Sequence, residues 1–317
     1  MLITGGAGFI GSHAVEALLA AGESVRVLDN FSTGRRENLA SMAGALEVVE
    51  GDIRDVATVA AAAAGCDRVL HLAAIASVTR SFDDPQETRA VNVEGTANVL
   101  AAAREAGARR LVMASSCAVY GTTDALPVGE TADPHPESPY ARSKLDGEEL
   151  CRAACGDGFD AGVLRFFNVY GPRQDPSSDY SGVIAIFMDR LAAERPCTVY
   201  GDGHQTRDFV FVNDVVAACR AALDDHTRGG APLAAEPINV GTGVETSLRD
   251  VLAALALASG REPAVRYAAA REGDIVRSRA ACERATDLLG FRASVAFPEG
   301  LAATWSWFLN AAASRAQ

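Results

Sequence analysis

The sequence has little positive charge and no long apolar run. Its 317 residues include 29 Lys and Arg against 41 Asp and Glu, which leaves a formal net charge of −12. An acidic chain without a basic tract is a poor ligand for nucleic acid or an anionic membrane. No apolar run reaches the ~20 residues of a membrane-spanning helix, and no basic-then-apolar signal segment precedes the first strand. We therefore expect neither a nucleic-acid nor a membrane partner.

The sequence also lacks the cysteine patterns of metal sites and disulfide scaffolds. It has seven cysteines, an odd number, with no CxxC pair and no close Cys/His spacing. Cys151 and Cys155 lie one turn apart in a predicted helix, where we expect them to be core thiols. This cysteine usage is typical of a reducing compartment, so we predict a cytoplasmic protein without a metal site.

What the chain does have is a glycine motif near its start. Met1–Thr4 are a short strand pattern, and Gly5, Gly8 and Gly11 lead into a helical pattern from His13 to Ala21. Glycines in such a strand–turn–helix unit let the backbone turn tightly, approach a pyrophosphate and pack the helix on the strand. The helix N-terminus then directs free N–H groups at the phosphates. The motif favours a dinucleotide site, although glycine triplets also occur as ordinary turns.

Strand and helix patterns then alternate along the chain. Predicted strands end at Asp29, Ile53, Ala74 and Ser116, with helical patterns between them. This alternation favours an α/β fold, a doubly wound parallel sheet with a ligand crevice at the carboxyl ends of its strands. Asp29 stands where a carboxylate accepts hydrogen bonds from the NAD ribose and repels the extra phosphate of NADP. Asp52, one residue before Ile53, could touch the adenine edge. Either carboxylate could instead be a solvated loop residue.

A serine, a tyrosine and a lysine follow at the same predicted edge. Ser116 ends the fifth strand, and Tyr140 and Lys144 lie four residues apart on the next helix, which places them on one face. An ammonium group ~4 Å from a phenol favours the phenolate by about 4 kcal/mol at an effective dielectric constant of about 20. We therefore expect Lys144 to lower the pKa of Tyr140 toward neutrality and make it a general base.

Together these motifs resemble those of the extended short-chain dehydrogenase/reductases, in particular the nucleotide-sugar epimerases and dehydratases. The resemblance covers nearly the whole chain and continues in Leu164–Gln174, Tyr200–Phe209 and Asn239–Gly243. It implies an NAD-binding Rossmann domain over residues 1–165, to which the chain returns at about 205–240. A smaller C-terminal α/β domain, which binds the nucleotide sugar, would take up most of residues 166–317.

The resemblance also implies the roles of individual residues. The catalytic residues would be Ser116, Tyr140 and Lys144. NAD would be bound by Gly5, Gly8, Phe9, Ile10, Gly11, Asp29, Asn30, Asp52, Ile53, Leu72, Ala73, Ala74, Tyr140 and Lys144. The UDP-sugar would be bound by Ser116, Asn168, Val183, Val199, Tyr200, Arg207, Arg271, Asp274 and Ser278. In this set, Asn168 and the two arginines contact the diphosphate, Asp274 lies beside the ribose, and Val199-Tyr200 form a wall for uracil. Arginines from separate loops suit a diphosphate in an acidic protein, although they could instead form surface ion pairs.

The two residues after Ser116 bear on the reaction. In the resembled sugar 4,6-dehydratases these positions are Asp and Glu, whereas this chain has Cys117 and Ala118. Alanine cannot transfer a proton, so 4,6-dehydration is disfavoured. The remaining set predicts an isomerase, a UDP-sugar 4-epimerase that works through a transient 4-keto sugar. The alternatives are a lyase or reductase on the same scaffold, such as a 5,6-dehydratase that uses Cys117, and a non-catalytic NAD-binding module. We expect Cys117 to be a packing residue.

Finer features concern the sugar and the assembly. Ser278 stands where a large aromatic residue restricts the resembled enzymes to glucose and galactose, so the small serine predicts UDP-GlcNAc/UDP-GalNAc as well as UDP-Glc/UDP-Gal. A UDP-glucuronate 4-epimerase is the alternative. Ala185, where relatives usually have proline, and Cys282, where aspartate is usual, depart from the pattern. The resemblance also implies a homodimer that pairs helices Val91–Ala106 and Tyr140–Cys155 as a four-helix bundle, and both helices have apolar stripes.

Overall fold

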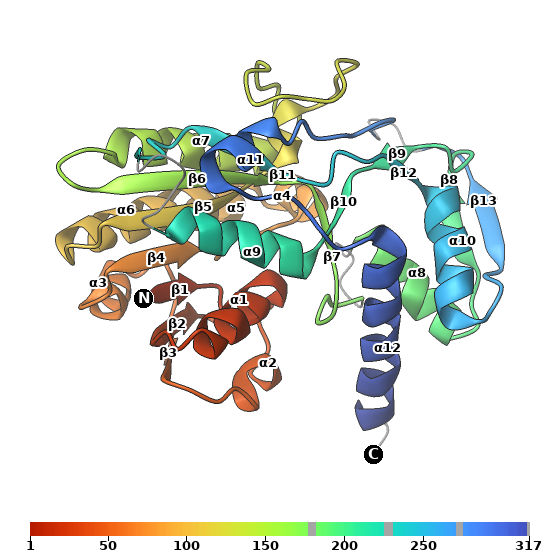
Figure 1. Cartoon of the computed structure of the whole chain (residues 1–317), viewed down its shortest axis with the longest axis horizontal. Helices are drawn as coiled ribbons and strands as arrows, with labels where there is room; N and C mark the ends of the chain where they lie inside the picture. The colour runs from red at the N-terminus through yellow and green to blue at the C-terminus, as the bar shows by residue number, and fades with distance from the viewer. Residues whose placement is uncertain (177–181, 225–230, 271–274, 316–317) are drawn as a thin grey trace.

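A computed structural model describes residues 1–176, 182–224, 231–270 and 275–315, and within these residues the fold centres on a seven-stranded parallel sheet (Figure 1). The strand order is β11-β6-β5-β4-β1-β2-β3. The order reverses beside β1, as in a doubly wound sheet. The strands are β1 (Leu2–Thr4), β2 (Val25–Asp29), β3 (Leu46–Glu50), β4 (Arg68–His71), β5 (Arg110–Ser116), β6 (Asp160–Phe166) and β11 (Pro237–Val240).

Helices cover both faces of this sheet. One face carries α3 (Val56–Ala63), α6 (Gly95–Glu105) and α7 (Pro139–Ala154), and the other carries α1 (Phe9–Ala20) and α9 (Val212–Leu223) (Figure 1). Successive strand residues point to opposite faces, so each strand serves two cores. In β5, for example, Leu111 packs in the core under α3 and α6, whereas Val112 packs in the core under α1 and α9. Burial on both sides explains why the strands are almost continuously apolar.

The second half of the chain adds short two-stranded sheets and a third core. Tyr170, Phe187, Phe209 and Trp305 are among the buried aromatic residues of this core. The chain returns to the main sheet through α9 and β11, while α11 (Glu283–Leu289) packs on both. The division into two domains near residue 165 stays a prediction. The other elements here are β7 (Asn168–Tyr170), β8 (Cys197–Tyr200), β9 (Thr206–Arg207), β10 (Phe209–Phe211), β12 (Thr246–Ser247), β13 (Val265–Ala268), α8 (Val183–Ala192), α10 (Leu248–Ser259) and α12 (Phe297–Arg315).

Some predicted boundaries were wrong. The helix expected over Val91–Ala106 is preceded by α4 (Val78–Asp83) and starts as α5 (Pro85–Arg89), because the Asp84 side chain caps it. It then passes through a π-helical turn at Ala90–Glu94 into α6. Among the strands, β3 ends at Glu50 rather than Ile53. The fourth strand, expected to reach Ala74, ends at His71, where its pairing with both β1 and β5 stops.

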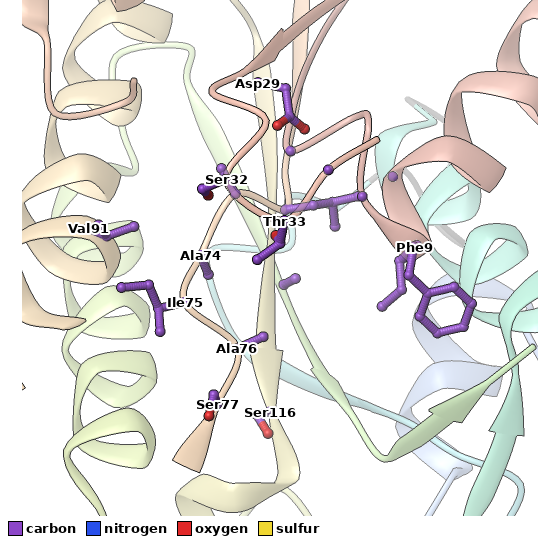
Figure 2. A pocket seen from close by; sticks show the side chains of 18 of the residues that line it. Phe9, Asp29, Ser32, Thr33, Ala74, Ile75, Ala76, Ser77, Val91 and Ser116 are labelled. Carbon is purple, nitrogen blue, oxygen red and sulfur yellow. The ribbon is translucent and has the colours of Figure 1, made fainter. Parts of the chain in front are cut away.

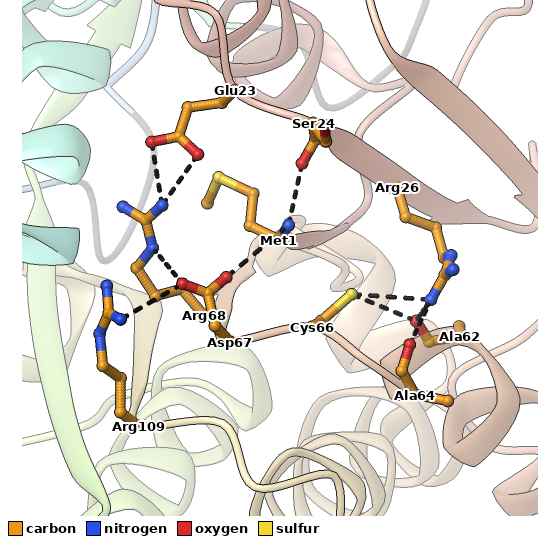
Figure 3. A network of polar contacts seen from close by, with 10 residues as sticks. All are labelled: Met1, Glu23, Ser24, Arg26, Ala62, Ala64, Cys66, Asp67, Arg68 and Arg109. Carbon is orange, nitrogen blue, oxygen red and sulfur yellow. Dashed lines mark hydrogen bonds and ion pairs between the residues drawn. The ribbon is translucent and has the colours of Figure 1, made fainter.

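The amino ends of the strands carry a network of ion pairs (Figure 3). Arg68 donates to both carboxylate oxygens of Glu23, at 2.9 and 2.8 Å, and to Asp67 at 3.2 Å. Asp67 also lies 3.4 Å from Arg109 and 4.0 Å from the amino group of Met1. The charges at this edge therefore compensate one another.

Within the residues that the structure describes, no helix is both long and apolar enough to span a membrane. The same residues contain no group of three or more His, Cys, Asp or Glu arranged to hold a metal ion. All seven cysteines lie in the described part of the chain and are free thiols.

Candidate active site

A cavity of about 570 Å³ opens at the carboxyl edge of the main sheet. Figure 2 shows Asp29 at one end of its lining and Ser116 at the other. All the predicted cofactor residues line this cavity, and so do Ser116 and Asn168. The structure therefore brings together residues from the ends of β1, β2, β4 and β5 and from α7.

The glycine corner forms one wall of the cavity. Gly5 has φ +72°, and a Cβ on it would lie 2.7 Å from the nitrogen of Ala73. A Cβ on Gly11 would lie 2.1 Å from the Gly5 carbonyl oxygen, so only glycine allows α1 to begin this close to β1. No side chain caps the N-terminus of α1. Its first N–H groups are left to bind an anion, and the corner fits the pyrophosphate of a dinucleotide.

Two carboxylates mark the far end of the cavity. Asp29 accepts hydrogen bonds from the backbone N–H groups of Ala7 at 2.9 Å and Phe31 at 2.8 Å, which fix its orientation. Asp52 accepts hydrogen bonds from Asn30 at 3.0 Å and from the Arg54 side chain at 2.9 and 2.7 Å. The hydrogen bonds from Arg54 hold the pKa of Asp52 well below its usual range. Both groups are therefore positioned to accept hydrogen bonds from a ligand.

The predicted catalytic residues meet at the other end. The Ser138 side chain caps α7 by accepting from the N–H of Ala141 at 3.1 Å, and the helix then presents Tyr140 and Lys144 to the cavity. Lys144 Nζ donates to the carbonyl oxygen of Ala114 at 2.9 Å and lies 5.9 Å from the centroid of the Tyr140 ring. Ser116 Oγ lines the same cavity and accepts from the N–H of Ala118 at 3.2 Å.

The expected shift in the pKa of Tyr140 is wrong for this structure. Burial raises that pKa to about 12, and hydrogen bonding to Ser116 only partly offsets it. Burial also lowers the pKa of Lys144 to about 8, although the charge of Glu148 opposes this. Desolvation of the phenolate raises the pKa of Tyr140 by more than the charge of Lys144 lowers it. The ammonium group of Lys144 is itself desolvated and donates a hydrogen bond to the Ala114 carbonyl. Without a further positive charge, Tyr140 stays protonated at neutral pH.

Cys117 is placed as a packing residue. Its side chain packs against a small apolar core that contains Val119, Tyr120 and Phe167. Burial, followed by the nearby Asp208 carboxylate, raises the pKa of the thiol to about 12. A thiol with this pKa is a poor proton donor or acceptor at neutral pH, which counts against a dehydratase that uses it.

The structure brings only some of the predicted substrate-binding residues to the cavity. Asn168 lines the cavity, and Val183 directly follows Gly182, which also lines it. Arg207 lies on β9 and donates to the Ile275 carbonyl at 2.6 Å, and both Tyr200 and Ser278 are partly exposed outside the cavity lining. Arg271 and Asp274 lie outside the described residues.

The expectation that the Val199 side chain forms a wall for uracil is wrong. Val199 is 1% exposed and packs in the core of the second half of the chain. The reason is the alternation of β8, in which Cys197 and Val199 point inward and Thr198 and Tyr200 point outward. Of the predicted pair, Tyr200 has its side chain outside this core and Val199 does not.

Several lining residues were not predicted. They lie in the loop after β2, in the loop after β4 and in the segment after β7. A search for polar or small residues just after each strand would have found the first two groups, because loops at the carboxyl edge face the crevice. These residues are Ser32, Thr33, Gly34, Ile75, Ala76, Ser77, Gln174 and Asp175.

A buried polar chain supports the catalytic edge from behind. His71 Nδ1 lies 2.7 Å from Thr4 Oγ1, and its Nε2 lies 2.9 Å from Thr96 Oγ1. The Thr96 hydroxyl donates to the Asn92 carbonyl at 2.6 Å, so it accepts from Nε2–H, and Nδ1 of the neutral ring accepts from Thr4. Burial, with the charge of Lys144, lowers the pKa of His71 to about 3. The Asn92 side chain then bridges Ile75 and Ser143 on α7.

Comparison with known proteins agrees with this geometry. A profile of the NAD dependent epimerase/dehydratase family matches residues 1–241. The chain belongs to this family. It is 44% identical over 315 residues to the UDP-glucose 4-epimerase of Mycolicibacterium smegmatis, with 98% of each chain covered. Two similar crystal structures are UDP-glucose 4-epimerases, one from Thermus thermophilus with NAD and one from Thermotoga maritima with UDP-glucose. Their identities are 40% and 34%, their TM-scores 0.87 and 0.90, and each comparison covers 98% of this chain and 99% of the other.

Membership of the NAD-dependent epimerase/dehydratase family confirms three predictions: the family itself, the doubly wound Rossmann fold and NAD as the cofactor. The glycine corner, the uncapped start of α1 and the oriented carboxylate of Asp29 fit that cofactor. A UDP-sugar decarboxylase from Bacillus cytotoxicus and a dTDP-glucose 4,6-dehydratase from Streptomyces venezuelae also match. The family and fold therefore do not specify the reaction.

Proposed function

We propose that this protein is an NAD-dependent isomerase, a 4-epimerase that interconverts UDP-glucose and UDP-galactose. The observation that carries the proposal is the meeting of Ser116, Tyr140 and Lys144 at one end of the cofactor cavity, with alanine at position 118. This set can move a proton at a sugar hydroxyl but has no carboxylate to eliminate water. The similarity to UDP-glucose 4-epimerases over almost the whole chain supports the same reaction.

The positions of these side chains support the following proposed roles. Bound NAD would supply a hydride acceptor for C4 of the sugar and a positive charge beside the phenol. Tyr140 would accept the proton of the 4-hydroxyl group, and Ser116 would hydrogen-bond to the same oxygen. Lys144, held by the Ala114 carbonyl at 2.9 Å, would stabilise the phenolate. Because burial alone keeps the pKa of Tyr140 at about 12, we expect proton transfer only when the cofactor site is filled.

The nucleotide half of the substrate would have to stay anchored while the 4-keto sugar turns over. Asn168 lies on the cavity, and its N–H donates to the carbonyl of Asp208, the residue that follows Arg207, at 3.0 Å; both Asn168 and Arg207 are proposed to bind the diphosphate. Arg271 and Asp274, which lie outside the described residues, would complete the nucleotide site. An anchored nucleotide with a free sugar is what allows hydride return to the opposite face of C4.

We also propose that UDP-GlcNAc and UDP-GalNAc are accepted, because Ser278 is small at the position assigned to the C2 side of the sugar. A UDP-glucuronate 4-epimerase is the second candidate on the same scaffold. The test incubates purified protein with UDP-Glc, UDP-GlcNAc and UDP-GlcA in parallel, with and without added NAD, and follows C4 inversion by NMR. Inversion of the first two supports the proposal, whereas inversion of UDP-GlcA alone favours the second candidate.

The same assay separates epimerisation from elimination. Deuterium from the solvent at C5, or net consumption of added NADH, would indicate a lyase or a reductase, respectively, and contradict the proposal. A Cys117→Ala variant is the matched control, because we expect it to keep full activity as a packing residue. No inversion with any UDP-sugar would also reject the proposal.

A cytoplasmic homodimer remains part of the proposal. The free state of all seven cysteines supports the location. For the dimer, the apolar stripes of α6 and α7 carry little weight, because Val99 and Cys151 are buried inside the chain itself. Better support is α4, which packs beside α5 and α7 and exposes 46% of Val78 and 60% of Phe82. We expect a dimeric mass in solution that Phe82→Glu converts to a monomeric one. A monomeric wild-type mass would contradict the dimer.

A further inference from the structure

We propose that residues 172–175, which follow β7, form a strap that closes the cavity and slows release of the dinucleotide, with the ion pair between Arg35 and Asp175 as its latch. The inference rests on the proposed function, because an epimerase must return the hydride that it removes and gains from keeping its NAD. It assigns a role in cofactor retention to residues outside the catalytic set.

The latch joins two walls of the cavity that are far apart in the sequence. Arg35 directly follows Ser32, Thr33 and Gly34, which line the cavity from the loop after β2. Asp175 lines it from the segment after β7, and its carboxylate pairs with the Arg35 guanidinium group. The Arg35 backbone N–H also donates to the Ala7 carbonyl at 3.0 Å, so this side of the latch is fixed to the glycine corner.

The strap has two further anchors, both on α1. The Pro172 carbonyl accepts a hydrogen bond from His13 Nε2 at 2.9 Å, and Arg173 donates to Glu16 at 2.6 Å. These contacts fix the start of the strap to α1, the helix whose N-terminus is the expected phosphate site. The strap is therefore attached at Pro172, Arg173 and Asp175, with the cavity beneath Gln174 and Asp175.

The backbone of the strap is strained. Arg173 has φ +66°, in the left-handed region that residues other than glycine rarely adopt. Such a conformation persists where surrounding contacts determine it, and it is common at ligand clamps. The anchors on α1 and the latch to Arg35 are those contacts here. Breaking the latch would let the strap relax away from the cavity.

The test measures release of NAD and does not depend on turnover. Protein loaded with radiolabelled NAD is diluted into excess unlabelled NAD, and the bound label is followed with time. The Arg35 and Asp175 side chains are 44% and 32% exposed, so the latch is a partly screened ion pair. We expect Arg35→Gln and Asp175→Asn each to speed release by about two- to fivefold. The charge-swapped double variant, R35D with D175R, should return to within about twofold of the wild-type rate.

The neighbouring arginine provides a matched control. Arg36 is also exposed and also forms an ion pair, but its partner Glu50 lies on β3, so that pair does not span the cavity. Arg36→Gln should leave the release rate unchanged. High salt should speed release from the wild type more than from Asp175→Asn, because screening weakens the latch only where both of its charges are present. This comparison needs only Asp175→Asn, so it still tests the latch if Arg35→Gln or the charge swap does not fold.

Two results would overturn the proposal. If Arg35→Gln speeds release while Asp175→Asn does not, and the charge swap fails to restore the rate, Arg35 acts by touching the cofactor directly. If both single variants release NAD at the wild-type rate, the strap does not limit release. If instead the variants change NAD release as expected but the wild type shows no C4 inversion, the proposed function fails while the strap stands.

Discussion

At the amino edge of the main sheet, charged side chains pair with one another, whereas at the carboxyl edge polar side chains surround a cavity. Arg68, Glu23, Asp67 and Arg109 form a closed network at the first edge (Figure 3). At the second edge, side chains such as Asp29 and Ser116 line an open space (Figure 2). The same strands pass through both edges, so the difference comes from the connections that follow them.

The direction of the strands explains this difference. Each strand enters its following loop and helix at the carboxyl edge, where helix N-termini present free N–H groups and a partial positive charge. Short loops there hold side chains by their backbone, as the N–H groups of Ala7 and Phe31 hold Asp29. At the amino edge, Arg68, Glu23, Asp67 and Arg109 pair with charges of the opposite sign. The comparison assigns chemistry to one edge and stability to the other, and the predictions below test that division in order of expected effect.

The largest effect should follow from Tyr140→Phe. Removing the phenol takes away the group proposed to accept the sugar proton, and general-base catalysis contributes about 10²–10⁴-fold. We expect C4 inversion to fall by at least about 10³-fold, measured by NMR with UDP-glucose. The thermal midpoint and the amount of bound NAD should stay close to wild type, which shows that the loss is chemical. A variant that keeps more than about a tenth of the activity would remove Tyr140 from the proposed role.

The second prediction concerns His71 and acid. The pKa of this buried ring is lowered to about 3, below the ordinary value of 6.5, so between these values the unfolded chain binds a proton that the folded chain does not. Stability from His71 is therefore full above pH 6.5 and is lost as pH falls toward 3. The loss should be about 2 kcal/mol between pH 6.5 and pH 5. Urea unfolding of wild type and His71→Gln at several pH values measures it, and equal pH slopes for the two proteins would contradict the prediction.

The third prediction compares one carboxylate from each edge. Asp29→Ala should weaken NAD binding by about tenfold, because the variant loses a charged acceptor for the ribose, worth about 1.5 kcal/mol. NADP binding should weaken less, because the carboxylate that repels its extra phosphate is gone. Asp67→Ala, at the amino edge, is the control and should leave both affinities unchanged. Titration calorimetry gives the constants, and the division between the edges is wrong if the two variants lose NAD affinity equally.

Local sequence signals were enough for much of the sheet and for the meeting of the catalytic residues. The alternation of apolar strands with helices predicts a parallel sheet, and the four-residue spacing of Tyr140 and Lys144 puts them on one face of a helix. The pKa of Tyr140 could not be predicted from the sequence, because it depends on how closely the fold encloses the phenol. The direction of the Val199 side chain could have been found from strand alternation, since Cys197 and Val199 share a face.

Contacts between distant segments were the hardest to predict. The pair of Arg35 and Asp175 joins loops 140 residues apart, and nothing near either residue indicates the other. The start of α5 shows the opposite case, because Asp84 and Pro85 together are a local capping signal that explains why the helix begins before Val91. Short-range sequence patterns therefore predict the helices and strands and the helix face that carries Tyr140 and Lys144. The contacts that close the site join distant segments, and such patterns do not predict them.

The smallest effect should come from the amino edge itself. Arg68→Met keeps much of the side-chain volume but removes the paired contacts with Glu23 and the contact with Asp67. Because Glu23 and Asp67 are 34% and 51% exposed, water can solvate them once they are unpaired, and the cost should be about 1 kcal/mol or less of unfolding free energy. The difference in unfolding free energy from wild type should shrink further at high salt.

Urea unfolding at low and high salt measures this difference, and the C4 inversion rate is expected to stay within about twofold of wild type. A large fall in that rate with a small fall in stability would show that the two edges are coupled, and would break the division between them.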